Sequence, residues 1–82
     1  MTRDLITLTV AHALRDERKR QDLSMERLAE KAGLSTSMIS LFERDLRNPT
    51  LDTLLRIAEV LDVDLGRVIQ KAATVAKKSS RA

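Results

Sequence analysis

Few residues in this chain are able to take part in covalent or acid–base chemistry. There is no cysteine, His12 is the only histidine, and no glycine-rich phosphate loop occurs. A lone histidine with no second ligand beside it does not make a metal site. The carboxylates near the predicted fourth and fifth helices are interpreted as helix caps and solvated charge: Asp52, Glu59, Asp62 and Asp64. The sequence therefore predicts that the protein is not an enzyme and that it uses no cofactor.

The side chains of this sequence can still form hydrogen bonds and ion pairs with a partner. The segment of interest for such contacts is residues 23–44. This stretch is predicted to form two helices of about eight residues each, joined by a tight turn. Ser24 and Ser35 precede the two helices as N-caps, since each hydroxyl can accept a backbone N–H that the first turn leaves unpaired. Gly33 follows the first helix, at the position where a left-handed residue commonly ends a helix.

Small and apolar residues give each of these two helices an inward face. Leu28, Ala29 and Ala32 share one side of the first helix. Ile39 and Phe42 mark the inward side of the second helix, three residues apart. Two short helices with a Gly-containing connection have helix-turn-helix geometry, which leaves the outer face of the second helix free to enter a groove in DNA.

The chain before this motif is predicted to be helical up to about Arg20 or Gln21. The start of this first helix is left open, because residues 6–10 are rich in β-branched side chains that also favour an extended conformation. Asp4 and Thr9 are the two candidate caps.

Two more helices are predicted after the motif. Pro49 excludes a continuous helix, and Thr50 is the predicted cap of a helix over residues 51–61. Its buried stripe, with Ile57 at the border, is predicted to consist of Leu51, Leu54, Leu55, Ala58 and Leu61. Asp64 is the predicted cap of the last helix, whose shared face holds Leu65, Val68, Ile69, Ala72 and Ala76. No strand pairing is indicated, so the predicted fold class is all-α with five helices.

Length and charge fit one small domain. The 82 residues are predicted to form a single helix-turn-helix domain over residues 1–76, with its core at about residues 10–69 and a frayed basic tail at 77–82. The net charge of +3 is uneven, because residues 66–82 carry five cations and no acid. One Phe and no Trp or Tyr argue against base stacking on single strands. No signal peptide or membrane span is recognised, so a cytoplasmic location with no membrane partner is expected.

The region from about Val10 to Ile69 resembles the lambda-repressor-like, Cro-type DNA-binding domains, also called the XRE family. The similarity lies in short motifs: Leu23-Ser24, Leu28-Ala29, Ala32-Gly33-Leu34-Ser35, Ile39-Ser40, Glu43-Arg44, Arg47-Asn48-Pro49, Leu54, Ile57-Ala58 and Leu61. The resemblance implies a compact five-helix bundle that binds double-stranded DNA.

In such a domain, residues 36–44 would form the recognition helix that lies in the major groove. The resemblance implies that the base contacts are made by Thr36, Ser37, Ser40 and Leu41. It implies phosphate contacts by Ser24, Arg44, Arg47 and Asn48. The alternatives are a solvated surface for the hydroxyls and, for the two arginines, exposed cations that balance helix-end carbonyls.

Charged residues outside the recognition helix follow the family pattern in part. Arg18 and Glu43 match a family ion pair between the first helix and the recognition helix, interpreted here as mainly structural. The basic cluster of the first helix is interleaved with acids and is interpreted as a solvated face: Arg15, Arg18, Lys19 and Arg20. Met25 replaces a frequent phosphate-binding Gln, and Asp22 and Asp45 replace family glycines. Both aspartates can adopt positive φ at some cost, and both are expected to weaken phosphate binding nearby.

The predicted function is sequence-specific transcriptional regulation by a homodimer on a palindromic operator. Two recognition helices about one DNA turn apart, roughly 34 Å, double the number of bases read. The predicted dimer interface lies on the last helix, at Leu65, Arg67, Val68 and Ala72. The alternative is a protein-interaction module, for example an antitoxin or a co-regulator, that keeps the fold with weak or no specific DNA readout. A toxin partner and a polymerase partner are left unassigned.

Overall fold

The computed structural model describes residues 3–79, which contain five helices and no strand. The helices are α1 (Arg3–Arg20), α2 (Met25–Ala32), α3 (Thr36–Glu43), α4 (Leu51–Leu61) and α5 (Leu65–Ser79). The predicted all-α, five-helix class is therefore confirmed. None of these helices is both long enough and apolar enough to cross a membrane.

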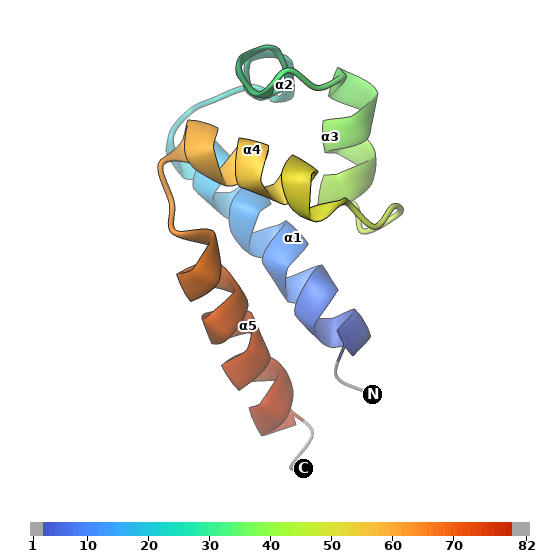
Figure 1. Cartoon of the computed structure of the whole chain (residues 1–82), viewed down its shortest axis with the longest axis vertical. Helices are drawn as coiled ribbons and strands as arrows, with labels where there is room; N and C mark the ends of the chain where they lie inside the picture. The colour runs from blue at the N-terminus through green and yellow to red at the C-terminus, as the bar shows by residue number, and fades with distance from the viewer. Residues whose placement is uncertain (1–2, 80–82) are drawn as a thin grey trace.

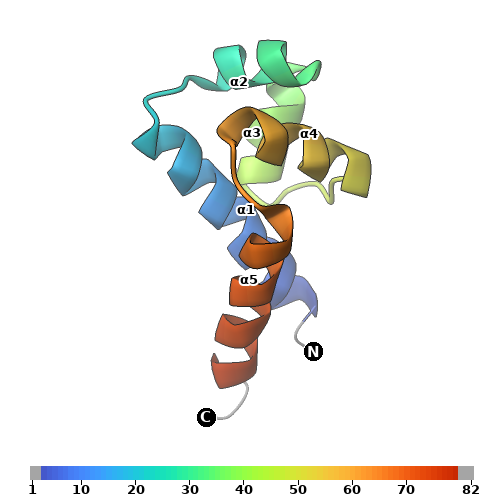
Figure 2. The ribbon, with the colours of Figure 1, turned by 60° about the vertical axis from the view of Figure 1, so that its left-hand side comes forward.

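Helices α1 and α5 run side by side in opposite directions, and they form the long axis of the molecule (Figure 1). Helix α4 packs on α1 and α2. Helices α2 and α3 lie together at one end, away from the first turn of α1 and the last turn of α5 (Figure 2). The helix-turn-helix thus forms one end of an elongated molecule that measures 40 × 22 × 20 Å.

Helix α1 begins at Arg3, so residues 6–10 are helical and the extended alternative is wrong. Thr9 lies well inside the helix and is not its cap; its hydroxyl donates to the Leu5 carbonyl at 2.7 Å. The same helix buries Val10 and Ala11. Packing of this face against the other helices outweighs the weak extended preference of the β-branched side chains.

The core joins all five helices. Its buried members are Val10, Ala11, Leu14, Leu28, Ala29, Ile39, Phe42, Ile57, Leu61 and Ala72. The predicted inward faces of α2 and α3 are confirmed, because every residue assigned to them is buried. No buried side-chain nitrogen or oxygen in the described part of the chain lacks a hydrogen-bond partner.

The predicted buried stripe of α4 is wrong at two positions. Leu51 and Leu55 are 64% and 51% exposed, whereas Thr53 and Ile57 are buried. The buried face of α4 is centred on Ile57. Thr53 can lie on this face because its polar atoms form hydrogen bonds within the first turn of the helix. Its hydroxyl accepts from the Thr50 hydroxyl at 3.0 Å, and its N–H donates to the same oxygen at 3.1 Å, which also makes Thr50 the predicted N-cap.

Helix α5 buries Leu65, Ala72 and Ala76, while Ile69 lies at the edge of the packed face. The predicted cap is present, because a carboxylate oxygen of Asp64 accepts a backbone N–H of the first turn at 3.2 Å. The helix continues to Ser79, so the first part of the predicted basic tail is helical. Residues 80–82, the rest of that tail, lie outside the described residues.

Candidate nucleic-acid interface

Local hydrogen bonds define both ends of the turn between α2 and α3. Ser24 and Ser35 have extended backbones, and each hydroxyl accepts the N–H of the third residue after it at 3.1 Å. Gly33 is left-handed at φ +71°, which lets the N–H of Leu34 donate to the carbonyl of Ala29 at 2.9 Å. The predicted caps and the predicted left-handed glycine are confirmed.

Arg56 of helix α4 forms a hydrogen bond to the end of α2 beside this turn, a contact that sequence reasoning missed. The Nη1 of Arg56 donates to the carbonyl of Ala32 at 3.3 Å, and its Nε donates to Asp52 at 2.8 Å. The spacing of Asp52 and Arg56 signals an i,i+4 pair, but no local pattern shows that the guanidinium reaches α2. The end of α2 is therefore held by a side chain from another helix.

Helix α3 presents one polar face to solvent because Ile39 and Phe42 anchor the opposite face in the core. Four residues predicted to contact bases lie on the outer face; Thr36 and Ser37 are exposed, and Ser40 and Leu41 are half-buried. Arg44 follows on the same side and is exposed, with its Nε directed to the Ser40 carbonyl at 3.4 Å. These side chains form a ridge of small polar groups that ends in a cation.

Arg18 and Glu43 form the ion pair that the family resemblance implies. The Nε and Nη2 of Arg18 donate to the two carboxylate oxygens of Glu43 at 2.7 and 2.9 Å. Its Nη1 donates to the Leu23 carbonyl at 2.8 Å. The hydrogen bonds that Arg18 donates to Glu43 raise the pKa of its guanidinium above its ordinary value. This arginine joins α1, the segment before α2, and α3, so its role is structural.

A basic hollow lies between α1 and α3, and sequence reasoning missed it. It is lined by Arg15 and Lys19 from α1 and by Ser40 and Arg44 from the α3 segment. Lys19 also lines an adjoining hollow beside Ser24. The signal was the i,i+4 spacing of Arg15 and Lys19, which puts both cations on one helical face. The solvated face predicted for α1 is thus directly adjacent to the ridge of α3.

The remaining predicted phosphate contacts lie in surface positions. Ser24 is exposed at the start of α2, and Arg47 and Asn48 are exposed in the loop after α3. Asp22 and Asp45 adopt positive φ values of 60° and 56°, as expected where the family has glycine. Their carboxylates add negative charge to the segments just before α2 and just after α3.

The predicted dimer interface is corrected by the packing of α5. Leu65 and Ala72 are buried in the core, so they are not available to a second subunit. Arg67 is exposed and Val68 is half-buried. Val75, two turns further along the helix, is 49% exposed. Arg67, Val68 and Val75 therefore remain wholly or partly exposed on this part of α5.

Comparisons with known proteins agree with this geometry. A family model described as Helix-turn-helix matches residues 14–68. The immunity repressor protein of Bacillus phage phi105 is 37% identical over 62 residues, which cover 76% of this chain and 43% of the repressor. The chain therefore spans less than half the length of that relative.

Two solved structures have the same arrangement of helices. The clp gene regulator ClgR from Corynebacterium glutamicum superposes with a TM-score of 0.80 over 94% of this chain and 82% of its own, and at 22% identity it shows the fold alone. The biofilm regulator SinR, solved in complex with DNA, is 34% identical with a TM-score of 0.68 over 73% of this chain and 97% of its own. The lambda-repressor-like fold is thereby confirmed.

Proposed function

Because the chain belongs to the XRE family of helix-turn-helix transcriptional regulators, we propose that it binds a palindromic operator as a homodimer, with α3 in the major groove. Members of this family are DNA-binding regulators and not enzymes, in agreement with the sequence-based exclusion. The observation that carries the proposal is the exposed polar ridge of α3, held outward by the burial of Ile39 and Phe42.

Sequence readout is assigned to the first turns of α3. The hydroxyls of Thr36, Ser37 and Ser40 can donate to or accept from several base edges, so each gives modest discrimination. Leu41 is assigned to contact with a thymine methyl group. Because these side chains are short, the backbone of α3 must approach the bases closely, and the small ridge permits that approach.

Phosphate binding is assigned to two groups beside this ridge. Arg47 and Asn48 are exposed in the loop after α3. Lys19 and Arg44 line one hollow between α1 and α3, next to Ser24 and the N-terminal N–H groups of α2. Cations in both groups hold the helix in register along the groove, although the net charge of the chain is only +3.

The dimer is proposed because one recognition helix reads only a few base pairs. Two copies related by a two-fold axis read a palindrome with half-sites about 34 Å apart. The contact between the copies is assigned to the surface of Arg67, Val68 and Val75 on α5, since Leu65 and Ala72 are occupied by the core.

Selection of bound duplexes from a random palindromic pool tests the proposed readout. The native chain is expected to select one half-site, and Ser37→Ala is expected to relax the preference at one base position. Arg47→Ala is expected to weaken binding to all sequences alike. Binding with no selected half-site and no salt resistance would instead favour the alternative, a protein-interaction module that keeps the fold.

Sedimentation at micromolar concentration, with and without the selected duplex, tests the dimer. Val75→Glu is expected to shift the chain toward monomer and to weaken binding to the full palindrome more than to one half-site. The matched control is Leu55→Glu, which places the same charge on a side chain of similar exposure on α4. A monomer both free and on DNA, or equal effects of the two variants, would reject this interface.

A further inference from the structure

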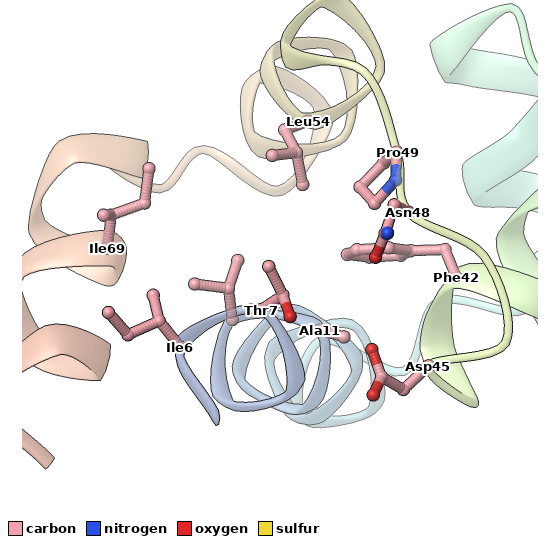
Figure 3. A pocket seen from close by; sticks show the side chains of 10 residues that line it. Ile6, Thr7, Ala11, Phe42, Asp45, Asn48, Pro49, Leu54 and Ile69 are labelled. Carbon is pink, nitrogen blue, oxygen red and sulfur yellow. The ribbon is translucent and has the colours of Figure 1, made fainter. Parts of the chain in front are cut away.

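A cavity of about 170 Å³ lies between α1, α4, α5 and the loop after α3. Figure 3 shows the side chains that surround it, and its walls are apolar: Ile6, Val10, Phe42, Pro49, Leu54 and Ile69. An engineered cavity of about 150 Å³ lined by Leu, Ile and Phe binds benzene. The cavity therefore has the volume and the lining to hold one small ring.

The accessible lining of the cavity is almost entirely apolar, and two exposed polar residues lie at one end of it. Asp45 and Asn48 lie there beside the ring of Phe42 (Figure 3). Asp45 carries the only charge among the residues that line the cavity. No side chain in residues 3–78 forms a hydrogen bond or ion pair with the carboxylate of Asp45. The hydroxyl of Thr7, by contrast, is already used in a 2.9 Å hydrogen bond to the Asp4 carbonyl.

We infer that this cavity binds a small organic cation: a single ring or a short branched hydrocarbon that carries one ammonium group. The hydrocarbon fills the space between Leu54 and Ile69, where apolar walls face one another. The ammonium lies at the end of Asp45, where the unpaired carboxylate supplies the opposite charge and the Phe42 ring supplies a favourable electrostatic face. A neutral hydrocarbon gains only the contacts with the apolar walls, and an organic anion is repelled by the carboxylate of Asp45.

Occupancy of the cavity is linked to the DNA-contacting segment. Phe42 is in α3, and Asp45 and Asn48 are in the loop that carries Arg47. A ligand that contacts these residues and a duplex that contacts their neighbours change each other's affinity by the same factor. This coupling rests on the proposed function, whereas binding of the cation does not and is measured without DNA.

Titration of the full chain with benzylamine, toluene and benzoate, followed by amide NMR shifts, tests the site. Benzylamine is expected to shift the resonances of the cavity-lining residues saturably and to bind about fivefold more tightly than toluene, the upper range for an exposed ion pair. Benzoate is expected to bind least. In Asp45→Asn the preference of benzylamine over toluene is expected to vanish, because Asn tolerates the left-handed backbone but carries no charge.

Filling the cavity gives the second test. Ile69→Phe is expected to abolish benzylamine binding, whereas the matched control Leu55→Phe, outside the cavity, is expected to retain it. The site is overturned if no probe gives saturable shifts there, if Ile69→Phe binds as the native chain does, or if the same resonances move only with protein concentration, which would mean that a second copy fills the cavity.

With benzylamine bound, operator affinity is expected to change at least threefold in the native chain and not in Ile69→Phe; an unchanged affinity overturns the coupling alone.

Discussion

The guanidinium of Arg18 and the carboxylate of Glu43 form two parallel hydrogen bonds, of 2.7 and 2.9 Å, between α1 and α3. The two residues are only 8% and 5% exposed. A buried pair of this kind is matched in geometry and charge, and removal of one member leaves the other charge buried without a partner. The orientation of α3 therefore depends on a residue 25 positions earlier in the chain.

Replacement of Arg18 by Met is expected to lower the free energy of unfolding by about 3–5 kcal/mol, because Glu43 loses its compensating charge. Urea denaturation measures the change. The control is Arg20→Met, whose solvent-exposed pair with Glu17 is expected to contribute much less to stability. The double variant Arg18→Met/Glu43→Leu is expected to be more stable than Arg18→Met alone. A single variant as stable as the native chain would show that the pair is dispensable.

Gly33→Ala is expected to destabilise the fold by about 1–2 kcal/mol, the usual penalty of the left-handed region for an L-residue. Its φ is +71°, and the added Cβ would lie 3.2 Å from Nη1 of Arg56. The chain's other glycine supplies the control. In Gly66→Ala the Cβ would lie 3.1 Å from a carboxylate oxygen of Asp64, but this position in the first turn of α5 needs no positive φ, so a change below about 1 kcal/mol is expected. Thermal unfolding of both variants compares the two effects, and equal losses would argue against backbone strain at Gly33.

Lys19→Ala is expected to reduce the slope of log affinity against log salt by about 0.9, the effect of one lost phosphate contact. The side chain of Lys19 lines two adjoining hollows, one with Ser40 in its wall and the other with Ser24. Lys77→Ala, an exposed cation near the end of α5 and outside the surface assigned to the second copy, is the matched control and should leave the slope unchanged. Fluorescence anisotropy at several salt concentrations measures both. A slope that is the same for Lys19→Ala and the native chain would remove Lys19 from the interface.

Stability in mild acid is expected to depend on Glu17. Hydrogen bonds from Arg20 at 2.5 Å and from Gln21 at 2.7 Å lower the pKa of this carboxyl below 4.5. The unfolded chain therefore takes up a proton at Glu17 before the folded chain does. The stabilisation is present above about pH 4.5 and is lost as the pH falls through the lower native pKa.

Glu17→Gln is accordingly expected to melt at a temperature that falls less steeply than that of the native chain between about pH 5 and pH 3. Differential scanning calorimetry across this range measures the two slopes. Glu59→Gln is the control, because Glu59 is exposed and forms no ion pair among the described residues. Parallel curves for native chain and Glu17→Gln would contradict the prediction.

The helix ends could be predicted because their determinants are local. Ser24, Ser35 and Thr50 each precede the N–H that they accept by three residues, and Gly33 supplies the backbone conformation that ends α2. Such signals need no knowledge of the tertiary structure. The outward face of α3 could be predicted for a similar reason, since the spacing of Ile39 and Phe42 fixes the opposite side of a short helix.

The parts that could not be predicted depend on contacts between distant helices. Leu51 and Leu55 match an apolar stripe as well as Ile57 does, and only the packing of α4 on α1 and α2 shows which side is buried. Burial of Thr53 requires the particular orientation of the Thr50 hydroxyl. The position of Lys19 beside α3 likewise follows from the crossing of α1 and α3, and not from its local sequence.

Arg56 reaches from α4 to the last carbonyl of α2, beside the turn in which Leu34 packs against the core. The hydrogen-bonded amides of Gly33 and Leu34 should consequently exchange with solvent more slowly than they would without this contact. Helices α2 and α3 would then bind a duplex as one rigid unit, and no free energy of binding would be lost in ordering the turn between them.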